Sequence, residues 1–347
     1  MSLFKLIEAL LLAGLPSFIK LPYLRMRGAK IGKGTRVSFL SILFVDEIEI
    51  GDDCRIWPAT IVHCRKLKLG NRVEIRALTV IDTVNVQIGH DSIVMEQVVV
   101  GGMKSPRSSL VIGARVKIFP YCFINPTEPI VIEDEVGVGG SNYLFTHGSW
   151  PSALDGYPIA FGPITIRKGV WLPWRVFILP NVEVGEHCTI GAGSVINRSV
   201  PAYSLAAGSP AKVLSADGAY IKPKTHDQQL EYVEQIIREM LEFMEFEGAV
   251  VDRRDSPGGL FVQLRGKGRA ADFLYCRDVV VGSEEADVLV SWSQISDSAR
   301  ENLIRRGTGW LDLASRQCFF GGNKRTHDVR AFFGRFGVRF SVWGEES

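Results

Sequence analysis

The stretch of sequence that decides the fold runs from residue 166 to residue 196 and reads IRKGVWLPWRVFILPNVEVGEHCTIGAGSVI. An aliphatic residue recurs every six positions, at Ile166, Leu172, Ile178, Val184, Ile190 and Ile196. A helix repeats at 3.6 residues and a half-buried strand at 2, so neither explains a period of six. A triangular coil explains it, because each hexad can form a short strand and a corner, and three hexads complete a circuit.

The same period extends toward the N-terminus. Upstream, four isoleucines stand six residues apart, at Ile112, Ile118, Ile124 and Ile130. Further upstream, four aliphatic-glycine pairs stand nineteen residues apart, at Ile31-Gly32, Ile50-Gly51, Leu69-Gly70 and Ile88-Gly89. The fifth position of each hexad is small and is expected to face inward, which gives Cys54 and Cys188 a packing role. The pattern predicts a mainly β domain of stacked parallel coils over residues 31–214.

The end of the repeat resembles a known family. The run from Val184 to Leu214, VGEHCTIGAGSVINRSVPAYSLAAGSPAKVL, is similar to the closing coils of sugar and xenobiotic O-acetyltransferases in the hexapeptide-repeat acyltransferase superfamily. The resemblance implies a left-handed parallel β-helix, a homotrimer and acetyl-CoA as acyl donor. Parallel crossovers are normally right-handed, so this handedness is an exception to the rule.

Composition limits the other classes of function. The 347 residues suggest about two units, and the net charge of +2 does not favour a nucleic-acid partner. The six cysteines never stand two residues apart, so they predict neither a zinc ribbon nor a redox pair but buried thiols in a reducing compartment. No metal site is expected.

The first thirty residues allow two interpretations. Residues 3–15 are mostly apolar, but they are too short to span a bilayer and are not followed by a signal-peptide cleavage pattern. Seven basic residues face one acid in residues 1–36. Residues 1–30 are therefore expected either to lie on an anionic membrane surface or to cap the open end of the coil domain.

The repeat is interrupted twice, and insertions of this kind often carry sites. The step from Ile88 to Ile112 is twenty-four residues, with the excess around 101–109, and the step from Ile132 to Ile166 is thirty-four. His147 stands where the second insertion leaves the coil. In the galactoside and maltose acetyltransferase branch, a histidine at a comparable break is the catalytic base, so the resemblance implies this role for His147.

Other residues near this break are candidates for the acceptor site. Asn142 is expected either to orient the acceptor or to be a turn residue. The insertion carries Trp150, Asp155 and Tyr157, which are expected either to contact a sugar acceptor or to pack on an adjacent subunit.

The resemblance also implies a coenzyme groove along the last coils. Ala192 would offer backbone groups to the pantetheine arm, and cationic or polar side chains would meet the phosphates at Asn197, Arg198 and Lys212. Trp174 stands where the family usually has a small residue, so the groove is either reshaped or the donor lies differently.

Beyond Leu214 the hexads stop. A capping box at Thr225 and Gln228 predicts one amphipathic helix up to Gly248, within a connector over residues 215–248 that is expected to pack on the coil domain or a neighbouring subunit. A small α+β domain is expected over residues 249–347, with strands at 260–264, 279–281, 288–292 and 310–313 and helices at 297–306 and 328–336.

Together these features predict an acetyl-CoA-dependent O-acetyltransferase. It would act on a sugar hydroxyl of a surface-polysaccharide precursor, in the cytoplasm at the inner face of the membrane, with His147 as general base. An N-acetyltransferase of a nucleotide-linked amino sugar and a catalytically silent scaffold remain as alternatives.

Overall fold

The computed structural model describes residues 3–256, 259–266, 269–277 and 286–344. The chain divides into two compact units, residues 1–222 and residues 223–347. Each unit is described by itself.

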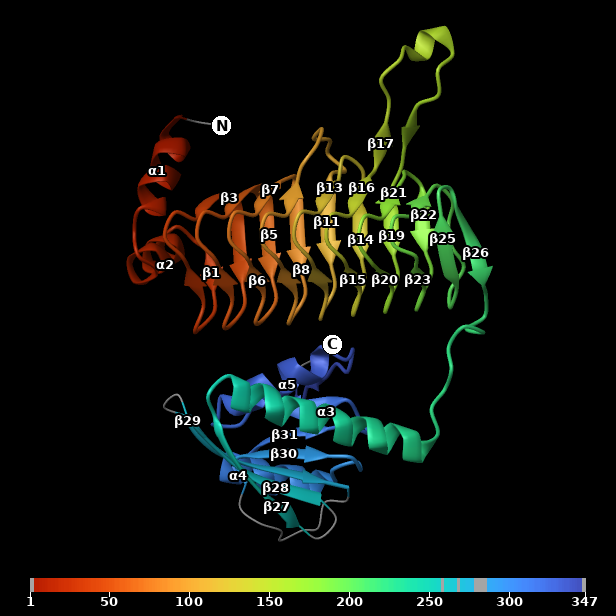
Figure 1. Cartoon of the computed structure of the whole chain (residues 1–347). Coiled ribbons are helices and arrows are strands. Elements are labelled where there is room, and N and C mark those ends of the chain that lie inside the picture. The colour runs from red at the N-terminus through yellow and green to blue at the C-terminus, as the bar shows by residue number, and fades with distance from the viewer. Residues whose placement is uncertain (1–2, 257–258, 267–268, 278–285, 345–347) are drawn as a thin grey trace. The chain divides into compact units, whose positions relative to one another are not determined.

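The first unit is a three-sided prism of parallel coils (Figure 1). Two of its faces belong to one 14-stranded sheet: β1 (Lys30–Ile31), β3 (Ile42–Ile50), β5 (Ile61–Leu69), β7 (Val80–Asp82), β8 (Asn85–Ile88), β10 (Val99–Val100), β11 (Ser109–Ile112), β13 (Phe123–Asn125), β14 (Ile130–Ile132), β16 (Tyr143–Phe145), β19 (Ile164–Ile166), β21 (Phe177–Ile178), β22 (Val182–Val184) and β24 (Val195–Ile196). The strands β3 and β5 join these faces, since β5 pairs with β7 through its first residues and with β8 through its last.

The third face is a 10-stranded sheet: β2 (Arg36–Val37), β4 (Arg55–Ile56), β6 (Glu74–Ile75), β9 (Ile93–Val94), β12 (Lys117–Ile118), β15 (Gly137–Val138), β20 (Trp171–Leu172), β23 (Thr189–Ile190), β25 (Leu205–Gly208) and β26 (Ala211–Ser215). β25 and β26 form an antiparallel pair that ends the prism.

The hexad aliphatics fill the prism interior. Ile166, Leu172 and Ile178 are all fully buried, and so are the small fifth-position residues, including Cys54 and Cys188. All six cysteines are free and buried. The predicted mainly β, parallel β-helix is therefore confirmed.

One prism face carries an apolar ladder on its outer side. Neighbouring coils pair the outward residues Ile42, Ile61, Val80, Val99, Phe123, Tyr143, Phe177 and Val195 in register. The Tyr143 and Phe177 rings stack with centroids 4.6 Å apart. On the other two faces, the first outward residues that pair in register are charged. They are Arg36, Arg55 and Glu74 on the 10-stranded face and Lys30, Glu49 and Lys68 on the remaining face. Outward apolar residues therefore concentrate on the face that we call the ladder face.

Two helices, α1 (Leu3–Ala13) and α2 (Ser17–Met26), close the first end of the prism (Figure 1). Ala9 and Ala13 of α1 and Leu21 and Leu24 of α2 are buried, and Leu21 belongs to the prism core. Across the described residues, no helix is both long and apolar enough to cross a membrane.

The second unit packs helices on a seven-stranded sheet. Its elements are α3 (His226–Phe246), β27 (Val250–Ser256), β28 (Gly259–Gly266), β29 (Arg269–Cys276), β30 (Val288–Ser291), α4 (Asp297–Arg306), β31 (Gly309–Asp312), β32 (Gln317–Phe319), α5 (Arg325–Gly334) and β33 (Ser341–Val342). The helix α4 has its predicted bounds. The strand expected at 279–281 lies outside the described residues.

The place of α3 differs from our expectation. Its capping box is formed as predicted. Its buried residues, among them Ile237, Met240 and Met244, share one core with Val262, Phe273 and the helix α5. The helix therefore belongs to the core of the second unit, because its apolar stripe is buried by that sheet.

Candidate functional site

The second interruption of the repeat forms an arm that leaves the prism after β16 (Figure 1). Its stem is an antiparallel pair, β17 (His147–Gly148) with β18 (Ala160–Phe161), and a 3₁₀ turn, η1 (Ala153–Asp155), lies near its tip. His147 is thus the first residue of the stem and lies at the edge of the ladder face. The backbone pairing at this point fixes the position of its Cα.

A short relay of hydrogen bonds orients the His147 ring. The Thr127 hydroxyl donates to Asn125 Oδ1 at 2.8 Å, and Thr127 Oγ1 lies 3.3 Å from His147 Nδ1. Because the hydroxyl proton points to Asn125, Oγ1 is left to accept a proton from Nδ1. The network therefore assigns the tautomer with Nδ1 protonated, in which Nε2 carries the lone pair of a base.

The first interruption of the repeat supports this relay. The hydroxyls of Ser105 and Ser108 both donate to the Thr127 carbonyl, at 3.1 and 2.9 Å. Arg107 pairs with Glu128, with its Nε 2.7 Å from Oε2, and holds the pKa of that carboxyl below its usual range. The two insertions, which are separate in sequence, therefore meet at Thr127 and Glu128.

The residue against the His147 ring is Phe161, on the returning strand of the stem. The two rings stack with centroids 5.8 Å apart and an interplanar angle of 22°. Sequence reasoning missed Phe161, Thr127 and Asn125. The pairing of His147 with Phe161 depends on the length of the arm, which the sequence alone does not fix.

Asn142 does not have the role that we expected. Its side chain is fully buried inside the prism. Its Nδ2 donates to the Leu172 carbonyl at 3.3 Å, and its Oδ1 accepts from the Val176 amide at 2.6 Å. Because both ends of the amide bind the next coil, Asn142 is a structural residue and not one that orients an acceptor.

The three candidates on the arm lie beyond its stem. Trp150 is 97% exposed, Tyr157 is 54% exposed and Asp155 is also exposed. Such exposure is compatible with either expectation, contact with an acceptor or with another protomer.

The candidates for coenzyme binding lie along two edges of the ladder face. Asn197 and Arg198 are exposed and directly follow β24, two coils beyond the edge that carries His147. Strand spacing puts two coils about 10 Å apart. Ala192 and Trp174 lie at the opposite edge, where the Gly193 amide donates to the Trp174 carbonyl. Exposed Lys212 is in the closing strand β26.

Trp174 is accommodated by a glycine. A Cβ built on Gly140 would come within 1.8 Å of the Trp174 ring, so the indole lies directly over the preceding coil. The centroid of the Phe119 ring lies 6.2 Å from that of Trp174 and 6.3 Å from that of Trp171. Trp174, which stands where the family usually has a small residue, thus forms an aromatic surface with Phe119 and Trp171 and is itself half exposed.

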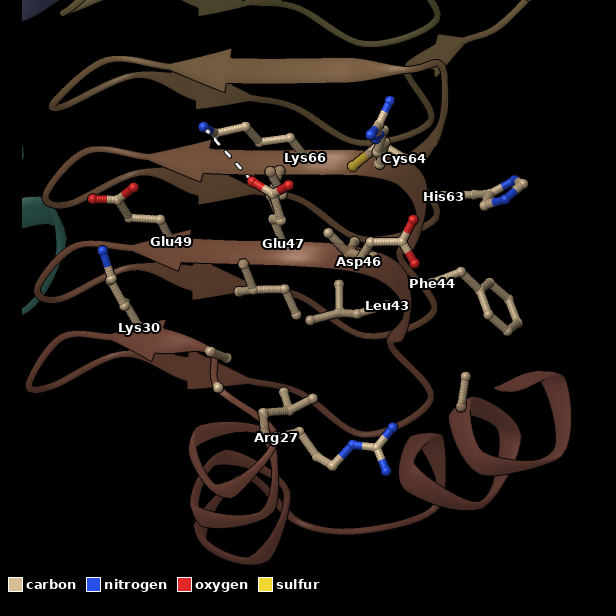
Figure 2. A pocket seen from close by; sticks show the side chains of 18 of the residues that line it. Arg27, Lys30, Leu43, Phe44, Asp46, Glu47, Glu49, His63, Cys64 and Lys66 are labelled. Atoms are coloured by element: carbon tan, nitrogen blue, oxygen red, sulfur yellow. Dashed lines mark ion pairs between the residues drawn. The ribbon is translucent and has the colours of Figure 1, made fainter. Parts of the chain in front are cut away.

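A hollow of about 850 Å³ lies at the first coils, away from the arm (Figure 2). There His63 Nδ1 lies 2.7 Å from Asp82 Oδ1, and Lys104 of the first insertion pairs with the same carboxylate. Lys66 lies 3.8 Å from Glu47. The charged groups in these pairs are thus bound to one another. Within the described residues, no cluster of three His, Cys, Asp or Glu side chains is placed to hold a metal ion.

Comparison with known proteins agrees with this architecture. Residues 163–198 match the family model described as bacterial transferase hexapeptide (six repeats). Serine acetyltransferase of Salmonella typhimurium is 38% identical over 92 residues, 26% of this chain and 31% of that protein. A Staphylococcus aureus protein named as an acetyltransferase is 47% identical over 60 residues, which are 17% of this chain and 30% of that protein. The chain thus spans about 30% of the length of these curated relatives.

Solved structures of the same kind are also similar. A hexapeptide-repeat acetyltransferase from Vibrio cholerae, complexed with acetyl-CoA, is 26% identical, with a TM-score of 0.33, over 37% of this chain and 69% of that one. The polysialic-acid-specific acetyltransferase NeuO is 21% identical, with a TM-score of 0.42, over 57% of this chain and 82% of that one. The predicted resemblance to the hexapeptide-repeat acyltransferase superfamily is confirmed by the family match.

Proposed function

We propose that this protein is a CoA-dependent O-acetyltransferase whose acceptor is a sugar hydroxyl of a surface-polysaccharide precursor. The observation that carries the proposal is the relay from Asn125 through Thr127 to His147, which leaves Nε2 as the base. A hydroxyl is a poor nucleophile toward a thioester, and a positioned base that removes its proton accelerates the attack.

His147 would act twice in direct transfer. Nε2 accepts the proton of the attacking hydroxyl as the new C–O bond forms, and the imidazolium then returns this proton to the sulfur as the C–S bond breaks. The products are the acetyl ester and the free thiol of CoA, so atoms and charge balance without an acyl-enzyme.

The donor is proposed to be acetyl-CoA, held along the edge of the ladder face. Arg198 and Asn197 are exposed on the same edge as His147, and Lys212 adds a cation in the closing strand. A guanidinium and an ammonium suit the pyrophosphate and 3′-phosphate of CoA. The small Ala192 corner and the Trp174 surface would flank the donor from an adjoining protomer.

A homotrimer is proposed because the ladder face offers an apolar surface along the whole prism. Eight outward apolar residues in register are unusual on a surface that faces water, and such patches mark interfaces. Trimer formation would place His147 beside a neighbouring protomer. Light scattering should give three times the 38.4 kDa chain mass. Replacing both Tyr143 and Phe177 with Glu should give monomers.

The activity is tested by following release of the CoA thiol with purified protein, acetyl-CoA and panels of hydroxy and amino sugars. We expect His147→Ala to lower kcat by roughly 10²- to 10⁴-fold. The control is His226→Ala, because His226 is exposed in the second unit. Undiminished turnover by His147→Ala would refute the assignment of the base.

The acceptor panel and a separate binding measurement distinguish the alternatives. Preference for amino sugars would identify an N-acetyltransferase instead. Absence of CoA binding by calorimetry would favour the silent scaffold.

A further inference from the structure

The cap of the prism exposes apolar residues where a surface helix normally carries polar ones. In α1 the large side chains of Ile7, Leu10 and Leu11 are 49%, 52% and 69% exposed, whereas the small Ala9 and Ala13 are buried. Positions 7, 10 and 11 recur at helical spacing and form one outward stripe. The helix therefore exposes Ile7, Leu10 and Leu11 and buries its small alanines.

The arrangement in α2 is similarly inverted. Phe18, Ile19 and Met26 are 76%, 44% and 79% exposed, while Lys20 is buried and donates from Nζ to the Ser38 carbonyl at 2.8 Å. Burial lowers the pKa of Lys20. The only lysine in α2 thus secures the first coil, and the outer side keeps the aromatic and aliphatic groups.

A loop of the first coil extends this surface. Phe39 and Leu40 are 55% and 51% exposed. The Leu40 amide donates to the Ala13 carbonyl at 2.8 Å, and the Val37 amide donates to Ser17 Oγ at 3.0 Å. These bonds hold the loop against the end of α1 and the start of α2. We call the eight exposed residues of α1, α2 and this loop the cap surface: Ile7, Leu10, Leu11, Phe18, Ile19, Met26, Phe39 and Leu40.

Within residues 7–36, the exposed charges beside the cap surface are basic. Exposed cations stand at Arg25, Arg27, Lys30, Lys33 and Arg36. The acid of this segment, Glu8, is mostly buried, accepts a hydrogen bond from Tyr23 and lies 3.7 Å from Arg27. An apolar surface flanked by cations matches an anionic lipid interface, where acyl chains receive the apolar side chains and headgroups receive the cations.

We propose that the cap surface docks the protein on an anionic lipid bilayer. A second copy of the chain fits less well, because an isologous contact would bring the same cations of two copies together. Docking would place the axis of the prism across the membrane plane, with the first coils nearest the lipid. The inference does not depend on the proposed activity, since vesicle binding is measured without turnover.

The test is flotation of the full-length protein with phosphatidylcholine vesicles, with and without about 30 mol% phosphatidylglycerol. We expect binding to the anionic vesicles and loss of most of it when salt rises from about 0.1 to about 0.5 M. The double variant Leu11→Ser, Phe18→Ser should lower vesicle affinity at least about tenfold. Thermal melting checks that this variant is folded.

The matched control is Trp150→Ser, Leu154→Ser, which removes two side chains that are 97% and 98% exposed on the arm. Its vesicle binding should equal that of the unaltered protein. The inference is overturned if the unaltered protein fails to float with anionic vesicles, or if the control loses as much binding as the cap variant. It is also overturned if the cap variant keeps vesicle binding but loses self-association, which would assign the surface to a second copy.

Discussion

The orientation of His147 by Thr127 leads to a sharp prediction for Thr127→Val. Valine has nearly the same shape as threonine, and Thr127 is 3% exposed, so the change removes a hydroxyl and little volume. The hydrogen bond from His147 Nδ1 is lost, and the ring is free to rotate or to adopt the other tautomer. Asn125 Oδ1 still accepts from the Thr127 backbone amide at 3.3 Å, so the chain around it should hold.

The magnitude follows from the worth of one neutral hydrogen bond. A net contribution of about 0.5–1.5 kcal/mol corresponds to a fall in kcat of roughly two- to twelvefold. This is far less than the loss expected for removing the imidazole. The KM for acetyl-CoA should change little, because Thr127 contacts the proposed base His147 and lies away from Arg198 and Lys212, which we propose bind the phosphates.

The assay is steady-state release of CoA thiol across a range of pH. Thr127→Ser keeps the hydroxyl and should restore most of the activity. Thr79→Val is the structural control, because Thr79 is equally buried and donates to the Met95 carbonyl at 2.8 Å on another coil. The reasoning is refuted if Thr127→Val retains full kcat, or if Thr79→Val lowers kcat by the same factor.

Three further predictions concern packing, ionisation and capping. Gly140→Ala should lower the free energy of unfolding by about 1–3 kcal/mol and alter tryptophan fluorescence, because the new methyl group would displace Trp174; Gly148→Ala, with open space around it, should leave both measurements unchanged. Burial raises the pKa of Cys64 to about 12, so a thiol reagent at about pH 8 should label it only in denaturant. Because this pKa lies above the unfolded value, its stabilisation should decline from about pH 8.5 toward pH 12 in urea titrations. Thr225→Ala should lower the stability of the second unit by about 0.5–2 kcal/mol in calorimetry, since it removes the cap of α3.

The sequence was sufficient to predict the prism because a period of six aliphatics specifies which side chains face inward. The same rule contained the answer for Asn142, which we misjudged. Asn142 occupies the fifth position of the hexad that begins at Val138, and fifth positions face inward. A buried amide must satisfy both of its ends, so it binds the backbone of the next coil.

The relay to His147 was beyond reach from the sequence for a different reason. Thr127 and His147 are twenty residues apart and lie on neighbouring coils, so their contact depends on how the coils are stacked at an irregular step. The interruption of the repeat pointed to His147, but its partner on the neighbouring coil, Thr127, is known only once the register between the two coils is known. Likewise, α3 showed an apolar stripe whose partner surface the pattern did not specify.

The stem of the arm has an implication for protein engineering. Because His147 pairs with Phe161 and the Gly162 amide donates to the Thr146 carbonyl at 3.0 Å, the chain enters and leaves the arm at nearly one point. Whatever lies between these anchors can be shortened or exchanged without stretching the connection. Transplanting residues 149–159 from a similar hexapeptide-repeat acetyltransferase should therefore leave the stem and His147 where they are, so that the effect of the arm on the proposed activity can be measured by itself.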